Sequence, residues 1–199
     1  MALFYDNDIR IFRTLCGSDN NNAYLVVCPQ TKESVIIDAP LGPEEILEHA
    51  EGTAVKAILI THRHRDHTEG LEQVASITRA PVLAHPADAP DIPGVPTPIE
   101  DGKIIRAGSL AIKAIHTPGH TPGSMCFLVS GHIFTGDTVY SGGPGESRGP
   151  EATIQILKNI TEKIYTLPDE TVVLPGHGHH SILRIPKREY RIFYSEHPD

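Results

Sequence analysis

The chain has 199 residues, with 17 Lys or Arg against 25 Asp or Glu and a formal net charge of −8. This length fits a single domain, residues 1–199, with enough apolar residues for a sizeable core. The acidic balance and the lack of a basic block argue against a nucleic-acid partner.

The three cysteines are dispersed and odd in number, so they predict no disulfide framework and favour a reducing cytoplasm. No apolar stretch approaches the ~20 residues that span a bilayer. The N-terminus has no basic region followed by an apolar run, so we expect neither a signal peptide nor a membrane anchor.

The first part of the chain predicts strands and one helix. Short segments rich in β-branched residues predict strands at 9–15, 23–27 and 34–37, with a polar turn at 19–22. Pro43, followed by two glutamates, predicts a helix that ends near Gly52. The continuous apolar run 57–60 predicts a strand that is buried on both faces.

The remaining elements continue this mixture. Leu71, Val74, Ala75 and Thr78 have the spacing of one helix face. The proline-rich stretch 86–98 and the glycine-rich stretch 141–149 predict surface loops. Further strands are predicted at 81–84, 104–107, 110–115, 125–129, 133–134 and 171–174. A second helix begins near Pro150, with an expected inward face formed by Ile154, Leu157, Ile160 and Ile164.

Five histidines and two aspartates form four short clusters, and each cluster lies just past a predicted strand end. These residues are His62, His64, Asp66, His67, His120, Asp137 and His177. Imidazole and carboxylate groups in this ratio bind borderline divalent metals without a thiolate. Seven ligands are too many for one tetrahedral ion, so they indicate two ions that share a bridge. Such a centre is typical of metal-assisted hydrolysis.

The spacing suggests how the ligands divide between two ions. His62 and His64 alternate with Arg63, so both imidazoles point the same way in an extended turn, and His120 is the best third ligand. Asp66 and His67 lie past that turn and need a partner, which His177 supplies. Asp137 can bridge, because one carboxylate can give an oxygen to each ion.

Each of these residues also has an ordinary structural interpretation. Asp66 with Glu69 can form a helix cap, Asp137 can form a turn, and His120 and His177 can be loop residues. Taken singly these interpretations are favoured, but three histidines and an aspartate within six positions are hard to explain structurally. Together the clusters favour a metal centre.

Other polar residues have open or minor roles. Asp38 either orients a ligand histidine or serves a turn or cap. His116 is expected at a strand end or beside the ligands. Arg63 and Arg65 are expected to serve solubility or to form local ion pairs. Solvated loop positions are the default for His179 and His180, and surface or packing positions for His49, His85, His132 and His197.

The order and context of these clusters resemble the metallo-β-lactamase superfamily over almost the whole chain. Its His-x-His-x-Asp-His motif stands at 62–67, and its later histidine, bridging aspartate and final histidine match His120, Asp137 and His177. The resemblance implies an α/β fold, a four-layer αββα sandwich with the metals at one edge of two packed sheets.

Within the superfamily, the segments 117–124 and 135–138 resemble the glyoxalase II branch, the hydroxyacylglutathione hydrolases. Two features differ from that branch. Only 22 residues follow His177, fewer than the helical substrate-binding domain of larger members needs. The segment 141–148 also lacks the Gly-Arg-Thr-Asp pattern of small members and persulfide dioxygenases. The chain is therefore similar to a compact, single-domain relative.

The resemblance implies hydrolysis of a small-molecule thioester, such as a hydroxyacyl-glutathione, by a hydroxide that bridges two divalent ions. Zn²⁺ is the expected metal, with Fe and Mn as alternatives, and Asp66 is expected to orient the nucleophile. One rival is a persulfide dioxygenase-like oxidoreductase with a single iron on His62, His120 and Asp137. The others are a hydrolase of a lactone, phosphodiester or β-lactam and a binding module without activity. Monomer and homo-oligomer remain equally open.

Overall fold

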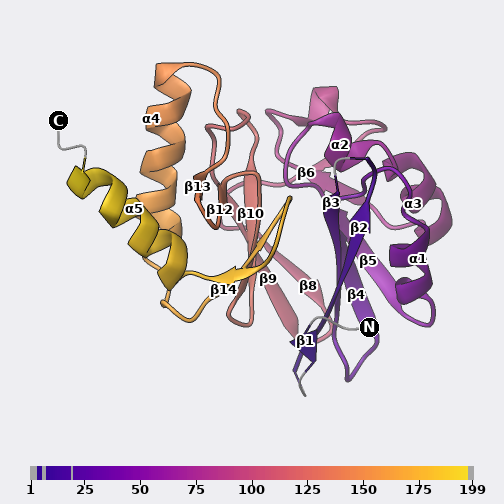
Figure 1. Ribbon diagram of the computed structural model, residues 1–199. Coiled ribbons are helices and arrows are strands. Elements are labelled where there is room, and N and C mark those ends of the chain that lie inside the picture. The colour runs from indigo at the N-terminus through magenta and orange to yellow at the C-terminus, as the bar shows by residue number, and fades with distance from the viewer. Residues whose placement is uncertain (1–3, 6–7, 19, 197–199) are drawn as a thin grey trace.

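The computed structural model describes residues 4–5, 8–18 and 20–196. Two β-sheets pack face to face, and helices cover the outer face of each sheet (Figure 1). The N-terminal half of the chain builds one sheet with its helices, and the C-terminal half builds the other. This is the α/β sandwich with αββα layers that the family resemblance implies.

The larger sheet has the strand order β1-β2-β3-β4-β5-β6-β7 within the described residues. Strands β1 to β4 pair antiparallel, whereas β4, β5, β6 and β7 run parallel. Parallel strands end at the same sheet edge, so the residues that follow β4, β5 and β6 come together there. The strands are β1 (Phe4–Tyr5), β2 (Arg10–Cys16), β3 (Asn21–Val27), β4 (Glu33–Ile37), β5 (Ala54–Leu59), β6 (Val82–Ala84) and β7 (Thr97–Pro98).

The second sheet has the order β15-β14-β11-β10-β9-β8. Only β11 and β14 pair parallel among its described strands, and this brings their ends side by side. A small hairpin of β12 and β13 follows β11. The strands are β8 (Ile104–Ala107), β9 (Leu110–His116), β10 (Met125–Val129), β11 (His132–Gly136), β12 (Val139–Tyr140), β13 (Gly143–Pro144), β14 (Val172–Pro175) and β15 (Ser181–Ile182).

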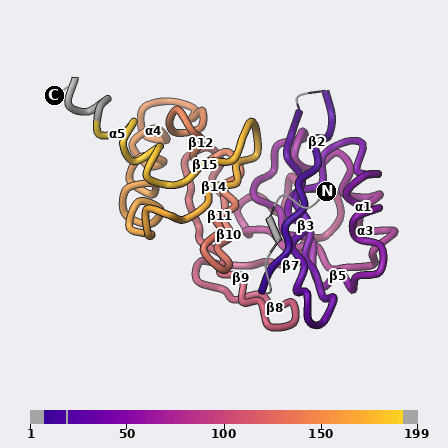
Figure 2. The backbone as a smooth tube through the Cα atoms, turned by 60° about the horizontal axis from the view of Figure 1, so that its bottom comes forward, coloured from indigo at the N-terminus to yellow at the C-terminus, as the bar shows by residue number. Residues whose placement is uncertain are grey.

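The helices form the two outer layers, which lie on opposite sides of the sheet pair in two views (Figures 1 and 2). Helices α1 (Glu44–Ala50), α2 (Arg65–Thr68) and α3 (Leu71–Thr78) lie with the first sheet, and a 3-10 turn, η1 (Ala89–Asp91), follows β6. Helices α4 (Pro150–Asn159) and α5 (Arg184–Glu196) lie with the second sheet. A π-helical turn, η2 (Ile160–Ile164), extends α4, with Tyr165 N–H donating to the carbonyl of Ile160.

Strand alternation builds the core. Leu59 of β5 faces the second sheet, whereas its neighbours Ile58 and Ile60 face α1 and α3. The prediction that the apolar run 57–60 is buried on both faces is therefore confirmed. A third apolar cluster, which includes Ile156 and Ile164, lies between the second sheet and α4 with its π-helical extension. Three core layers thus separate four structural layers.

Some sequence predictions about elements were wrong. Ile154 is 68% exposed, and Ile156, two residues on and roughly 200° around the helix, is buried instead. The other predicted positions are confirmed: Ile160 and Ile164 are buried, and Leu157 is partly buried against the same cluster. The loop expected at 86–98 contains η1 and β7, and the loop expected at 141–149 contains β13, the second strand of the β12–β13 hairpin. Two-residue strands and single helical turns have too few residues to leave a periodic pattern.

No helix among the described residues has both the length and the apolar character needed to cross a membrane.

Candidate metal centre

The first four candidate ligands follow β5 directly. His64 has an extended backbone (φ −61°, ψ 143°) and stands just before α2. His62 and His64 therefore point to the same side, as the alternation predicts, and the helical turn that begins at Arg65 aims Asp66 and His67 at a second point. The strand end and the one-turn helix together give this short segment two groups of ligands.

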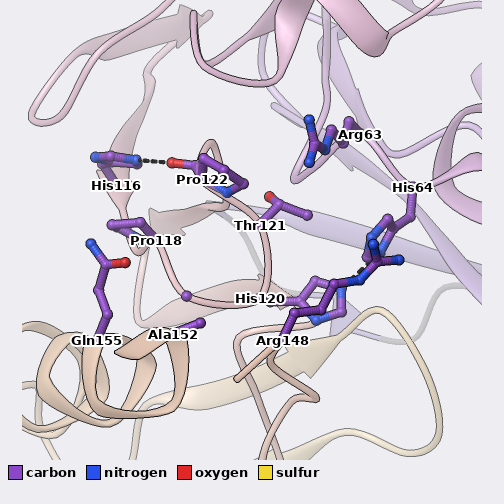
Figure 3. A pocket seen from close by; sticks show the side chains of 11 residues that line it. Arg63, His64, His116, Pro118, His120, Thr121, Pro122, Arg148, Ala152 and Gln155 are labelled. Carbon is purple, nitrogen blue, oxygen red and sulfur yellow. Dashed lines mark hydrogen bonds between the residues drawn. The ribbon is translucent and has the colours of Figure 1, made fainter. Parts of the chain in front are cut away.

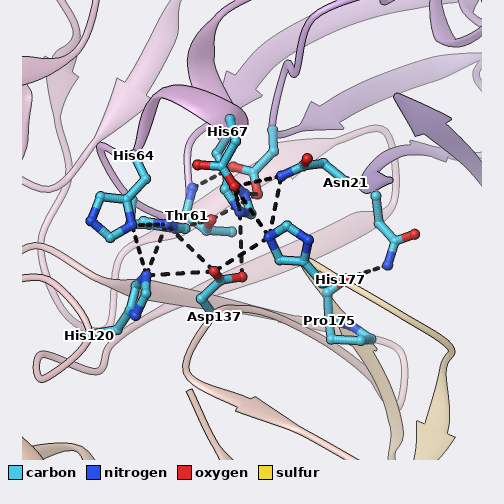
Figure 4. A network of polar contacts seen from close by, with 12 residues as sticks. Asn21, Thr61, His64, His67, His120, Asp137, Pro175 and His177 are labelled. Carbon is cyan, nitrogen blue, oxygen red and sulfur yellow. Dashed lines mark hydrogen bonds and ion pairs between the residues drawn. The ribbon is translucent and has the colours of Figure 1, made fainter. Parts of the chain in front are cut away.

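The other three ligands come from the second sheet. His120 lies in the turn between β9 and β10, and Asp137 comes immediately after β11. His177 follows β14, the parallel neighbour of β11, so these two ligands emerge from adjacent strand ends. The structure thus brings all seven predicted residues together where the edges of the two sheets meet. Figure 4 shows His64, His120, Asp137 and His177 pointing toward one another.

Three imidazoles form the first cluster, His62, His64 and His120. His120 Nε2 lies 3.2 Å from His62 Nε2 and 2.9 Å from His64 Nδ1, and the latter two nitrogens are 3.1 Å apart. Four-coordinate zinc binds imidazole nitrogens at about 2.0–2.1 Å in a tetrahedral arrangement. Nitrogens at such a site lie slightly more than 3 Å from one another, so the triangle has the size that a cation needs.

Neighbouring groups fix the protonated nitrogen of two imidazoles in this cluster. Thr61 donates its hydroxyl hydrogen to Asp38, so Thr61 Oγ1 accepts from His62 Nδ1. His120 Nδ1 donates to the carbonyl of Glu146 at 2.6 Å. In both rings the Nε2 lone pair therefore faces the centre of the cluster. Facing lone pairs repel, and a cation between them removes the repulsion.

Asp66, His67 and His177 form the second cluster. Asp66 Oδ2 lies 3.2 Å from His177 Nε2 and 3.6 Å from His67 Nε2. Asp137 stands between the clusters: Oδ1 is 3.4 Å from His67 Nε2, and Oδ2 is 3.6 Å from both His120 Nε2 and His177 Nε2. One carboxylate thus presents an oxygen to each group, which is the arrangement of a bridge.

Two buried atoms at this centre have no hydrogen-bond partner among the described residues. They are His67 Nε2 and Asp137 Oδ1. The two atoms lie 3.4 Å apart, an ion-pair distance, but neither has a hydrogen bond in the described part of the chain. A buried polar atom without a hydrogen bond costs free energy, because the bonds it made to water are not replaced. A divalent cation between them would satisfy both atoms. The residues present therefore fit a metal centre.

Burial and local charge give the histidines different pKa values. Burial, together with the neighbouring imidazoles, holds the pKa of His62 well below its usual range, and it also lowers the pKa of His64. Burial opposes charge on His67 as well, but the carboxylates of Asp38 and Asp137 outweigh it and raise the pKa of His67 to about 10. The positive charge of a protonated His67 offsets part of the negative charge of these two carboxylates, and a cation would take the place of that proton.

The carboxylates of the centre favour the charged form. The hydrogen bond with His177 lowers the pKa of Asp66, against the effect of burial. Burial alone would raise the pKa of Asp137, but the contact with His67 lowers it. Both side chains are therefore ready ligands for a cation near neutral pH. The phenol of Tyr140 stays protonated, because burial and the nearby Asp137 carboxylate raise its pKa far above the usual range.

Asp38 has the first of its two predicted roles. It follows β4 and lies next to the end of β5, and its Oδ2 accepts from His67 Nδ1 at 2.8 Å. It also accepts from the backbone N–H and the hydroxyl of Thr61, both at 2.8 Å. Asp38 therefore fixes the tautomer and direction of His67 and, through Thr61, of His62.

The predicted turn at 19–22 concealed two buried residues. Asp19 lies outside the described residues, but Asn21 and Asn22 are the first residues of β3 and do not form a turn. Asn21 Nδ2 donates to Asp66 Oδ2 at 2.8 Å, and Asn22 Nδ2 donates to the carbonyls of Pro175 and Gly178. Asparagine is typical of turns, and for this reason the sequence predicted a turn here. The one signal for a longer strand was the apolar run 23–27 that follows, which could have been extended back by two residues.

Gly176 is a second contributor that the sequence prediction missed. A Cβ at this position would collide with Asp137 Oδ1 and lie 2.5 Å from His67 Cε1. The backbone beside His177 therefore passes directly against two candidate ligands. The Pro-Gly-His-Gly pattern was a possible signal, because glycine permits close backbone approach.

The other histidines that the structure describes lie outside both clusters. His116 ends β9 as expected, and its ring stacks on that of His85 at 3.7 Å. His49 stacks on Phe12, a packing role as predicted. His132, His179 and His180 take no part in either cluster, and His197 lies outside the described residues. The local ion pairs predicted for Arg63, with Asp91, and for Arg65, with Glu69, are confirmed.

Two solved structures are similar to the chain over most of its length. The first is described as TTHA1623 in a di-iron-bound form, with a TM-score of 0.76 and 30% identity over 89% of this chain and 98% of that chain. The second is described as ETHE1 from Myxococcus xanthus, with a TM-score of 0.81 and 26% identity over 90% of this chain and 82% of that chain.

Among curated proteins, a hydroxyacylglutathione hydrolase of Polaromonas sp. is 33% identical over 165 residues. The match covers 80% of this chain and 62% of that protein, so the chain spans less than two thirds of this relative's length. Residues 16–177 match the Metallo-beta-lactamase superfamily, and they include all seven candidate ligands. The fold, the converging histidines and aspartates and this match agree: the chain belongs to the metallo-β-lactamase superfamily.

Proposed function

We propose that the chain is a metal-dependent hydrolase that cleaves a small-molecule thioester such as a hydroxyacyl-glutathione. The observation that carries this proposal is the convergence of the seven side chains on two adjoining clusters with Asp137 between them. The similarity to a relative named hydroxyacylglutathione hydrolase supports the thioester class.

In this proposal the first cluster, His62, His64 and His120, would hold one divalent ion. The second cluster, Asp66, His67 and His177, would hold the other, and Asp137 would serve as a ligand to both. When bound, such a pair supplies the Lewis acidity that activates water and polarises a carbonyl group. We infer zinc as the metal, because imidazole with carboxylate suits it, with iron and manganese as alternatives. The di-iron form of TTHA1623 supports a similar fold taking two ions.

The surroundings of the centre suit this chemistry. A cavity of about 480 Å³ opens beside His64 and His120, and Arg63 and Arg148 also line it (Figure 3). It gives a substrate carbonyl a path to the first cluster. Asp66 is fixed by Asn21, so its carboxylate can accept a proton from the attacking water and orient it. A thiolate leaves readily, so no dedicated acid is needed for the leaving group.

One geometric observation favours the rival, a mononuclear iron enzyme of the persulfide dioxygenase type. Asp137 Oδ2 lies 4.0 Å from His62 Nε2 and 3.6 Å from His120 Nε2, which resembles the two-histidine, one-carboxylate set of oxygen-activating iron. The rival leaves Asp66, His67 and His177 without a role. We therefore favour the dinuclear hydrolase.

Elemental analysis followed by two assays on the same sample tests the proposal. We expect two metal ions per chain and hydrolysis of a hydroxyacyl-glutathione thioester, with no oxygen uptake on glutathione persulfide. One iron per chain with persulfide-dependent oxygen uptake would establish the rival. A chain that binds no divalent metal would refute both.

We further propose that the chain forms one domain and works in the cytoplasm on a small molecule. Its cysteines, Cys16, Cys28 and Cys126, are all free and buried, which is compatible with a reducing compartment.

A further inference from the structure

Asp88 is a buried carboxylate that belongs to neither of the two ligand clusters. It follows β6 and lies within the proline-rich stretch 86–98, yet its exposed fraction is 0%. A carboxylate is almost never fully buried unless partners satisfy it. The identity of these partners indicates what Asp88 does.

The partners of Asp88 come from two segments that carry candidate ligands. Its Oδ2 accepts from the backbone N–H of Arg63, between His62 and His64, at 3.0 Å. The same oxygen accepts from the hydroxyl of Thr121, next to His120, at 2.6 Å. Its Oδ1 accepts from the backbone N–H of Gly123 at 2.8 Å. One carboxylate thus joins both segments of the first cluster.

These two segments belong to different sheets. The segment 62–64 follows β5 of the first sheet, whereas 120–123 joins β9 to β10 of the second. The approach is close: a Cβ on Gly123 would lie 2.5 Å from Asp88 Cγ. A backbone bond from Met125 N–H to the Thr61 carbonyl also crosses between the sheets, just below the ligands. Asp88 connects these two segments through its side chain at the level of the first cluster.

We propose that Asp88 is a positioning residue that sets the distance between His120 and the His62–His64 pair, and so the affinity of the first cluster for its cation. This inference rests on the proposed metal centre. Among the described residues the hydrogen bonds and ion pairs of the Asp88 carboxylate are with Arg63, Thr121 and Gly123, and none is with the second cluster, so we expect its effect to be confined to the first. Residues that orient metal ligands typically change affinity by about 10- to 100-fold when replaced.

The chain offers a matched control in Asp91. Arg63 pairs through its guanidinium with Asp91, and its Nε lies 3.9 Å from Asp88 Oδ1. The Asp91 side chain is exposed and makes no contact with the turn that holds His120. Asp91→Asn therefore removes a charge beside Arg63 but leaves the junction of the two segments intact. Figure 3 shows Arg63 and Thr121 beside His64 and His120 at the mouth of the cavity.

The experiment measures zinc affinity of the first cluster by competition with a chromophoric chelator, and cobalt absorption reports its coordination geometry. The full chain carries His177→Ala, which disables the second cluster so that one site is measured. Asp88→Asn replaces one acceptor oxygen with an NH₂ group that faces the donors. We expect zinc affinity to fall about 10- to 100-fold with an altered cobalt spectrum. Asp91→Asn should leave both unchanged.

Several outcomes would overturn the proposal. A folded Asp88→Asn protein with unchanged zinc affinity would leave Asp88 only a role in stability. If Asp88→Asn does not fold, Thr121→Val is the second test, because it removes one of the three hydrogen bonds that Asp88 accepts. We expect a smaller loss of zinc affinity than for Asp88→Asn. Unchanged zinc affinity in Thr121→Val would also refute the positioning role. A parent chain, without His177→Ala, that binds no divalent metal, whether zinc, iron or manganese, would refute the proposed function itself, which separates the two failures.

Discussion

The two candidate clusters are built from different ligands and differ in spacing. The first contains only imidazoles, with nitrogens 2.9 to 3.2 Å apart. The second contains a carboxylate and has separations of 3.2 to 3.6 Å. Each cluster has one buried member, His62 or His67, and two partly exposed ones. The more compact set of three imidazoles is already close to the spacing of a tetrahedral site, so we expect the first cluster to keep its ion longer.

The difference follows from how each cluster is held. Asp38 orients one histidine of each cluster, directly for His67 and through Thr61 for His62. Beyond this shared contact, the second cluster depends on Asn21 and on the loop after β14. The first cluster is therefore held by buried carboxylates at strand ends, whereas the second also depends on the loop after β14, which contacts β3.

The largest expected effect removes the residue that both clusters share. Asp137→Ala should lower metal content and activity together, with activity falling more than about 10³-fold, or roughly 4 kcal/mol. The measurement is metal per chain with thioester turnover on the same preparation. A variant that keeps two metals and the full rate would contradict the bridge.

A smaller effect separates the two clusters. His177→Ala should leave one ion per chain after dialysis against a weak chelator, because the first cluster is intact. His120→Ala should instead lose the more tightly held ion. For His177→Ala we expect activity to fall about 10²- to 10³-fold, the range for losing one group that stabilises developing charge. Equal retention of metal by the two variants would refute the difference in affinity.

Asp38→Asn tests the buried support that the two clusters share. The asparagine NH₂ group would face His67 Nδ1–H or the Thr61 donors, because one oxygen no longer accepts. We expect metal affinity to fall about 10- to 100-fold, measured by chelator competition. Asp101→Asn, which affects a surface ion pair with Lys163, is the control and should leave affinity unchanged.

The smallest effect concerns stability of the metal-free protein. The folded-state pKa of His67 is raised from 6.5 to about 10, so its stabilising contribution is full below about pH 6.5 and is lost as pH rises toward 10. The free energy of unfolding, measured with urea in the presence of a chelator, should fall over this window. His67→Gln should flatten the slope. An equal slope in both proteins would assign it to other groups.

Much of the fold and of the candidate centre could be predicted from the sequence. The apolar run 57–60 and the ligand residues 62–67 that follow it are local patterns. They made it possible to predict the buried strand and the change from an extended to a helical backbone after it. His120 could be assigned to the same ion as His62 and His64, because two imidazoles need a third ligand to form a site. The αββα arrangement required the resemblance to a family, because periodicity does not decide which sheet a strand joins.

The residues that support the ligands were harder to predict. Asp88 lies in a proline-rich stretch and Asn21 in a polar run, and both compositions are typical of exposed loops. Their burial depends on contacts with segments 33 and 45 residues away in the chain. Ile154 misled for a related reason, because several isoleucines near α4 fit a helical face and only packing selects among them.

The position of the metal centre across both sheets has a consequence for the protein as a whole. Four of its seven groups belong to one half of the sandwich and three to the other, so a captured ion pair would act as a cross-link between the halves. Free energy released on loading then also opposes unfolding, and it grows with the logarithm of free metal concentration. The folded lifetime of the chain would thereby depend on the supply of its own cofactor.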